Sequence, residues 1–491
     1  MSVAVIQRGR GNEENNPMKH LVVLGILVAI TFTTVRNKIS HGPYDYDEAD
    51  YMSAASLGLE RNWVDAGSMP LTDFVAAGRR SGADANQRAG LSALARSGSD
   101  PVVYRHWHGP LYYFWLTIPS SIKANEHTTR ELSLVFPVVT VLVIYCGSLL
   151  ILGGIEGQVA AILASALFLW SPVTLETTEL APHMLFVLWY VCGLMLLAKA
   201  AAGGGRRYYY AAVVCAGLAA ATLEVAFVLI LVLAIFAWWQ RRQLGADLVL
   251  ARNSIGVLLA TVLVSWPTGL LKLNFVKAYM VMVYLAVFRK GAWGDVTFLQ
   301  TWSRRIAVSP VEWFLFAAAL VLLIATGKRQ DRRYGMVFLL FAGLMILATL
   351  RVYAEGTRYM TPFFAAVEIF TAWTLAPMLV RFARPALVYG ALGVICFSLI
   401  WNSERQLSGF RLNENPAAFA VIDAIRARGL AEKTLLIPRM DIPTLHYYFP
   451  GMQTQAYTDP GEISIDRRDR HFDAVLYSDG SLDTGESGAG R

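Results

Sequence analysis

The sequence predicts an all-α polytopic membrane protein with a small α/β unit after its last membrane segment. Of the 491 residues, 55% are hydrophobic and only 16% are charged, whereas soluble domains have about 25% charged residues. Apolar segments long enough for membrane helices recur along the chain, and basic residues gather in alternate short connections. These observations together exclude an ordinary soluble domain.

Eleven segments approach the length of a membrane-spanning helix, which needs about 20 mostly apolar residues. They are 19–36, 132–153, 157–172, 181–200, 208–222, 223–240, 254–271, 310–327, 335–350, 359–380 and 386–402. The fifth and sixth are separate helices only if the chain reverses near residues 222–224. We therefore predict about 11 transmembrane helices.

Basic residues give these helices a direction, because they favour the cytoplasmic side of a membrane. They precede the first segment and lie in the short connections of one side: Arg8, Arg10, Lys19, Arg206, Arg207, Arg241, Arg242, Lys328, Arg329, Arg332, Arg333, Arg381 and Arg384. The N-terminus is thus predicted to be cytoplasmic and the C-terminus to lie on the outer side. Compact loops favour the inner membrane of a bacterium.

This topology divides the chain into four parts. We expect a cytoplasmic N-terminus at 1–18, a transmembrane domain at 19–402 with a large outer loop at 37–131, a small outer α/β domain at 403–477, and a disordered tail at 478–491. A second outer segment spans 272–309. The α/β domain is expected to hold a helix at 415–429 and strands at 434–438 and 474–477, and residues 71–100 are expected to form a mobile loop.

Residues 43–52 contain four acids and three tyrosines directly after the first membrane segment. Asp45, three residues before Glu48, has the spacing of a helix cap, and capping alone explains such a pair in a soluble protein. At a membrane face, however, a carboxylate shielded by tyrosines is suited to act as a general base or to hold a divalent cation. We predict that Asp47 and Glu48 are catalytic.

Two histidines, His106 and His108, precede Gly109-Pro110 at the end of the same outer loop. Either they belong to an aromatic belt at the membrane interface, or His108 and Glu48 form part of a metal site. Later outer turns contain four more ionisable groups: Glu176, Glu179, His183 and Glu224. These groups either lie in solvated loops or face a polar cavity.

Arginines at three outer positions break the inside-positive pattern: Arg304, Arg305 and Arg358. The planar donor fork of arginine suits a phosphate, so we predict that these residues bind a phosphate at the membrane surface. The alternatives are contact with lipid headgroups and a simple pair between Arg358 and Glu355.

Three of these features occur together in one family. The acidic pair after the first segment, His108-Gly109-Pro110-Leu111-Tyr112-Tyr113, and Arg358-Tyr359-Met360-Thr361-Pro362 resemble the polytopic glycosyltransferases of the GT-C superfamily, close to the protein O-mannosyltransferases and the lipid A aminoarabinose transferases. The resemblance covers roughly residues 15–402. It departs from the family at Gly109, where a second proline is usual, and at 179–183, where many members have an aspartate.

This resemblance implies transfer of a sugar from a polyprenyl-phosphate donor to a lipid, glycan or protein acceptor at the outer face, with inversion. Asp47 matches the catalytic acid, with Glu48 as its partner, and Arg358 matches the family arginine. We expect these side chains to contact substrate: Tyr46, Tyr51, His106, His108, Tyr112, Glu179 and His183. A divalent metal ion is the one cofactor suggested, and no nucleic acid is expected.

Three other functions remain open from the sequence. A transporter or flippase would show paired, broken helices and ionisable groups near mid-membrane, but no internal repeat is visible and most acids lie in outer loops. A ligase or polymerase with an oligosaccharide donor would have nearly the same sequence features. A catalytically inactive scaffold would not need Asp47 and Glu48.

Overall fold

The protein is a bundle of long helices with a smaller layer at one end. This computed structural model describes residues 17–64, 69–81, 108–177, 180–245, 247–280, 298–326, 332–349, 357–382, 384–406, 416–438, 441–457, 463 and 471–484. Each predicted membrane segment coincides with a helix: α1 (Pro17–Arg36), α8 (Val135–Leu152), α9 (Gly154–Leu169), α11 (His183–Lys199), α12 (Arg206–Ala220), α13 (Phe227–Trp239), α15 (Leu248–Ser265), α19 (Pro310–Thr326), α20 (Arg332–Thr349), α21 (Thr361–Phe382) and α22 (Pro385–Gln406). In the described part of the chain, five helical stretches are long and apolar enough to cross a membrane. The polytopic α-helical prediction is confirmed.

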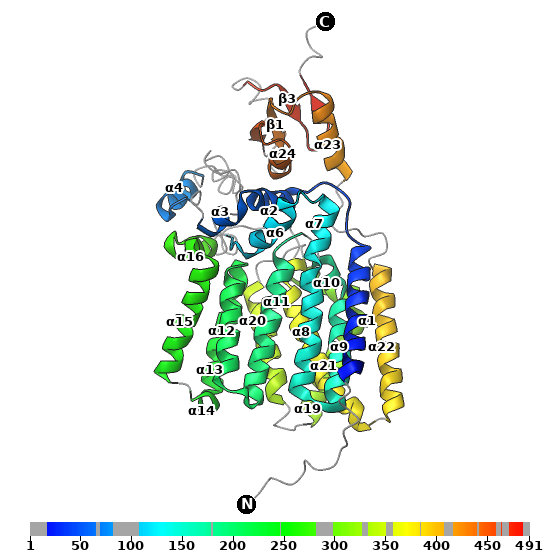
Figure 1. Cartoon of the computed structure of the whole chain (residues 1–491). Coiled ribbons are helices and arrows are strands. Elements are labelled where there is room, and N and C mark those ends of the chain that lie inside the picture. The colour runs from blue at the N-terminus through cyan, green and yellow to red at the C-terminus, as the bar shows by residue number, and fades with distance from the viewer. Residues whose placement is uncertain are drawn as a thin grey trace, which may run out of the picture.

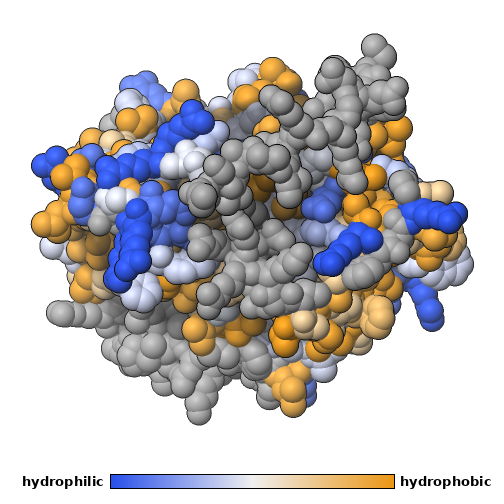
Figure 2. All heavy atoms as spheres, turned by 90° about the horizontal axis from the view of Figure 1, so that it is seen from below, coloured by the Kyte–Doolittle hydropathy of each residue, from blue (hydrophilic) through white to orange (hydrophobic). Residues whose placement is uncertain are grey.

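The long helices run side by side and alternate in direction, so their connections lie at two opposite ends (Figure 1). One end contains short elements next to basic residues, namely η2 (Ala200–Gly204) and α14 (Arg241–Leu244). Hydrophilic side chains gather at two edges of this face (Figure 2). The chain reverses at η3 (Glu224–Ala226), so 208–222 and 223–240 are separate helices as predicted.

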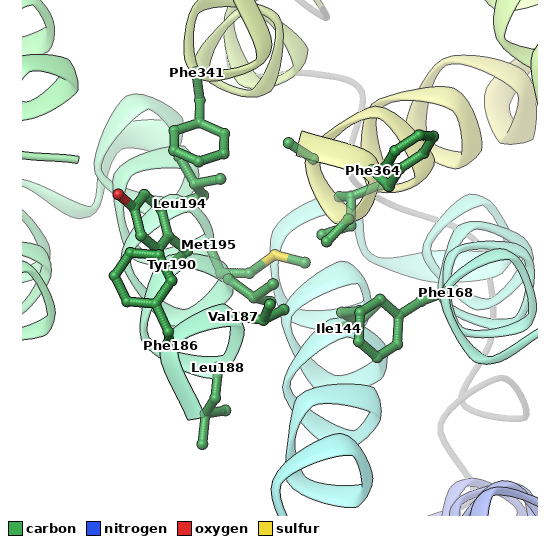
Figure 3. Packing of buried hydrophobic residues seen from close by; sticks show 14 of the residues in the cluster. Ile144, Phe168, Phe186, Val187, Leu188, Tyr190, Leu194, Met195, Phe341 and Phe364 are labelled. Carbon is green, nitrogen blue, oxygen red and sulfur yellow. The ribbon is translucent and has the colours of Figure 1, made fainter. Parts of the chain in front are cut away.

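Helices α11 and α21 occupy the centre of the bundle. About 78% of the apolar window of α11 and 72% of that of α21 are buried, against 17% for α15 and 22% for α22 at the periphery. Figure 3 shows α11 side chains such as Tyr190 and Met195 between Ile144 of α8, Phe341 of α20 and Phe364 of α21. Buried alanines let α9 and α21 pack closely, as is usual between membrane helices.

The opposite end is covered by short helices: α2 (Tyr46–Ser56), α3 (Gly58–Val64), α4 (Leu71–Ser81), α6 (Leu111–Ser121), α7 (Glu126–Ser133), α10 (Pro172–Thr177), α16 (Pro267–Leu271), a helix at 274–280, α18 (Phe298–Val308) and η4 (Thr357–Tyr359). Residues 71–81, the start of the segment expected to be mobile, form helix α4 rather than a loop. This stretch is rich in good helix formers and has Asp73 in the first turn, where an acid favours a helix. The rest of the expected loop lies outside the described residues.

A small α/β unit lies beyond this layer (Figure 1). It consists of α23 (Pro416–Ala427), β1 (Thr434–Pro438), α24 (Ile442–Tyr448), β2 (Gln453–Tyr457), β3 (Ala474–Leu476) and β4 (Leu482–Asp483). The strand order is β2-β1-β3-β4, with β1 parallel to β2 and β3, and β4 antiparallel to β3. The apolar strands β1 and β3 were predicted, whereas the polar sequence of β2 gave no strand signal.

Candidate active site

Two residues that the sequence singled out separately lie in contact. The Arg358 guanidinium Nη2 donates to Asp47 Oδ2 over 2.8 Å, although the residues are 311 positions apart. Asp47 stands in the first turn of α2 and Arg358 in η4, directly before α21. Their side chains are 15% and 27% exposed, so the pair is accessible but largely shielded from water. Arg358 also lies over the Tyr359 ring, with 5.5 Å between Cζ and the ring centroid.

Asp45, which precedes the catalytic candidates, caps α2. Its carboxylate accepts hydrogen bonds at the start of the helix, and Glu48 Oε2 accepts one from the Asp45 backbone N–H at 3.4 Å. The two residues therefore form a capping box. The capping interpretation is correct for this pair, and it leaves Asp47 between them to face Arg358.

Glu48 is held by Arg130 from α7. Both side chains are nearly fully buried, and Arg130 donates from Nε to Oε1 over 2.9 Å and from Nη2 to Oε2 over 2.5 Å. The same guanidinium donates to the backbone carbonyls of Ser40, Gly42 and Pro43. This bidentate pair ties α2 to α7 and to the segment before it.

Glu48 and His108, the predicted metal ligands, have different partners. Both Glu48 oxygens accept from Arg130, and His108 Nδ1 lies 3.3 Å from Glu224 Oε2. Among the described residues, no group of three or more His, Cys, Asp or Glu side chains is placed to hold a metal ion. The residues present do not fit a metal centre built on Glu48 and His108.

His108 and Glu224 form a buried polar pair that joins the segment before α6 to the turn before α13. Burial lowers the pKa of His108 below 6.5, and the Glu224 carboxylate opposes this shift. At the neighbouring Gly109, a Cβ would lie 2.0 Å from the Ala221 carbonyl oxygen. No residue with a Cβ fits against this backbone, so a proline could not replace Gly109.

His183, the first residue of α11, completes the cluster. Its ring meets the edge of Tyr359, with centroids 4.8 Å apart, and it lies within electrostatic range of Arg358 and His108. Neither ring nitrogen of His183 has a hydrogen-bond partner among the residues that the structure describes, although the side chain is buried. An imidazole in this state can form a hydrogen bond with a polar group of a bound molecule.

Tyrosines line the α2 side of the site. The Tyr51 ring lies 5.7 Å from that of Tyr112 and 5.9 Å from that of Tyr113. Burial, and then the charge of Asp47, raise the pKa of Tyr51 well above 10, so its hydroxyl remains protonated. Tyr46 contributes its backbone N–H, which is bonded to Asp45 Oδ1 and Thr444 Oγ1.

Several predicted residues are not placed by the structure. His106, Glu179 and Glu355 lie outside the described residues, as does the side chain of Arg304. Arg305 is in the last turn of α18. Sequence reasoning missed three residues that support the site: Arg130, Thr444 and Tyr448.

The fold matches solved structures of membrane proteins. The chain is similar to ArnT from Cupriavidus metallidurans in the apo state, with a TM-score of 0.56, 12% identity, and coverage of 93% of this chain and 89% of that one. It is also similar to ArnT bound to undecaprenyl phosphate (TM-score 0.55, 13% identity, 93% and 90% covered) and to the Archaeoglobus fulgidus oligosaccharyltransferase in the apo form (0.56, 12%, 90% and 65%). No family model matches the chain, and no curated protein matches it. These likenesses confirm the GT-C type of fold.

Proposed function

We propose that this chain is an integral membrane glycosyltransferase that moves a sugar from a polyprenyl-phosphate donor to a hydroxyl group of a lipid, glycan or protein acceptor. The observation that supports this most directly is the Asp47–Arg358 pair, in a chain with the fold of ArnT. It places a carboxylate and a guanidinium at one shielded point at the end of a helix bundle. A lipid-linked donor can reach such a point from the membrane.

The two side chains have complementary roles in a single displacement. The Asp47 carboxylate accepts the proton of the acceptor hydroxyl while the oxygen of that hydroxyl forms a bond to the anomeric carbon of the sugar. The bond between that carbon and the phosphate oxygen breaks, and the configuration inverts. Arg358 stabilises the negative charge on the departing lipid phosphate, because a guanidinium carries a permanent positive charge and a planar set of N–H donors that suits phosphate oxygens.

The surrounding residues are assigned to binding rather than to proton transfer. His108, whose lowered pKa keeps it neutral at pH 7, and the buried His183 would contact sugar or acceptor hydroxyls, with Tyr51 and Tyr112 alongside. Glu48, held by Arg130, would position α2. Arg304 and Arg305 remain candidates for a second phosphate contact. We place the site and the C-terminus on the outer side of a bacterial inner membrane, as the basic connections predict.

Transfer by the purified protein from radiolabelled polyprenyl-phosphate sugars, both monosaccharide and oligosaccharide donors, tests the proposal. Wild type should consume a donor, and Asp47→Asn should lower the rate about 100-fold or more, because general-base catalysis contributes about 10²–10⁴-fold. The matched control is Asp73→Asn, an exposed acid on α4, which should behave as wild type. Equal rates for wild type and Asp47→Asn would remove Asp47 from the mechanism.

One observation favours transport as a second candidate. Glu312 and Glu368 are buried in the helix bundle and line a small cavity between α9, α19 and α21, with Ser171 donating to Glu312 over 3.3 Å. Buried acids among membrane helices are typical of ion or proton pathways. Uptake or flipping of lipid-linked sugar by reconstituted vesicles, lost in Glu368→Gln but kept in Asp47→Asn, would support a transporter instead.

A further inference from the structure

The segment that leads into α2 has two backbone N–H groups bonded to the C-terminal unit. Tyr44 N–H donates to Tyr448 Oη over 2.8 Å, and Tyr46 N–H donates to Thr444 Oγ1 over 2.9 Å. The first N–H groups of a helix have no partner within the helix itself. Here two side-chain hydroxyls of α24, about 400 positions later in the chain, accept hydrogen bonds from N–H groups at and just before the start of α2.

The backbone between these contacts is strained. Tyr46 has a φ of +23°, a region that a bulky side chain rarely adopts. Such a conformation is energetically unfavourable and persists only where the surroundings hold it. Its N–H is shared between Asp45 Oδ1, at 3.0 Å, and Thr444 Oγ1. Because Asp47 follows directly, the direction of its carboxylate depends on this backbone being held.

Helix α24 also contacts α7, the helix that binds Glu48 of α2. Tyr448 Oη, besides accepting from Tyr44, donates to Glu126 Oε1 over 2.8 Å in the first turn of α7. One turn further along α7, Arg130 binds Glu48. The Tyr44 ring also meets that of Tyr447 at its edge, with centroids 5.2 Å apart. Helix α24 therefore contacts both α2 and the helix that anchors it.

We propose that Thr444 and Tyr448 are positioning residues, through which the C-terminal unit fixes the start of α2 and so aims Asp47 at Arg358. This inference rests on the proposed transferase function for its catalytic consequence. The hydroxyl of Thr444 holds Tyr46 in its strained conformation, and the hydroxyl of Tyr448 links that conformation to α7. The unit then has a direct task in catalysis, although it lies outside the helix bundle.

The experiment combines amide hydrogen exchange with steady-state transfer in the full-length protein. Thr444→Val and Tyr448→Phe each remove one hydroxyl and keep the shape. Thr444→Ser returns the hydroxyl. The matched controls are Thr434→Val, on β1, and Tyr457→Phe, whose hydroxyl donates to Leu476 O within the unit.

We expect faster exchange at the Tyr44 and Tyr46 amides in Thr444→Val and Tyr448→Phe, with kcat lowered about three- to tenfold and KM for the donor nearly unchanged. Thr444→Ser should restore both readouts, and the two controls should match wild type. Unchanged exchange and kcat in Thr444→Val would overturn the proposal, as would an equal loss of kcat in the controls.

Amide hydrogen exchange does not require activity, so it tests this inference independently of the proposed function. If wild type transfers no sugar, the transferase proposal fails, and the exchange rates alone decide whether α24 holds α2. Faster exchange in both variants would then sustain the contact, and rates equal to wild type would reject it.

Discussion

Asp47 and Arg358 form an ion pair of 2.8 Å between two short segments that open different helices, α2 and α21. Removing either charge should therefore affect the same step. We expect Asp47→Asn and Arg358→Gln each to lower the transfer rate about 100-fold or more, and the double variant to lose far less than the product of the two losses. A double-mutant cycle on kcat measures this. Fully multiplicative losses would show that the two residues act independently.

The buried pair between Glu48 and Arg130 should be essential for stability. Glu48→Gln leaves a buried guanidinium without its counter-charge, and breaking such a pair costs about 3–5 kcal/mol. The matched control is Glu131→Gln on the same side, which breaks a more exposed pair with Arg36 and should cost about 1 kcal/mol or less. Thermal unfolding in detergent measures both. Similar melting temperatures for the two variants would contradict the structural role of Glu48.

Gly109 should not tolerate any side chain. Gly109→Ala would push a methyl group into the Ala221 backbone, whereas Gly256→Ala, in α15, meets nothing within 4 Å. We expect the first variant to fold poorly or to lose the contact between His108 and Glu224, and the second to match or exceed wild type in stability, since alanine is the better helix former. The yield of monodisperse protein and the melting temperature check this. A stable, active Gly109→Ala would contradict the close approach.

Asp441, just before α24, should make stability depend on pH. Burial, and then the charge of Asp45, raise the pKa of Asp441 from 3.8 to about 6. The folded protein thus favours the protonated acid, so its stabilising contribution is complete below pH 3.8 and is lost as the pH rises to about 6. Asp441→Asn, which has no charge at any pH, should stabilise the protein above pH 6 relative to wild type and have little effect near pH 4.

Melting temperatures of wild type and Asp441→Asn between pH 4 and 8 test this sign. Asp423→Asn, an exposed acid on α23 that pairs with Arg426, is the control and should show no such difference. A constant difference between wild type and Asp441→Asn at every pH would refute the interpretation.

The sequence was sufficient for the helix bundle, and it singled out Asp47 and Arg358 separately, which the structure places in contact. Long apolar runs form helices in a membrane because their backbone polar groups must be satisfied internally, so the order of the helices follows from the sequence. Asp47 and Arg358 were found because each lies beside a membrane segment within a recognisable motif. Their contact with each other could not be predicted, because nothing local relates positions 311 apart.

The supporting residues had no such signal. Arg130 stands in a short polar helix, where an arginine is ordinarily solvated, and only the fold shows that it is buried against Glu48. Thr444 and Tyr448 act through single hydroxyls toward backbone N–H groups, a contact that leaves no pattern in composition or spacing. The polar strand β2 was missed for a related reason, since it is defined by its pairing with β1.

The separation of Tyr44 and Tyr448 along the chain also determines how long after Tyr44 the residue Tyr448 is synthesised. A ribosome adds roughly 5–20 residues per second, so the 404 positions between them take roughly 20–80 s to synthesise. Throughout that interval, the start of α2 is already made but lacks the hydroxyls that hold it. The nascent chain must therefore keep this segment from misfolding while the later helices are inserted, and the site is completed only after Tyr448 has been synthesised.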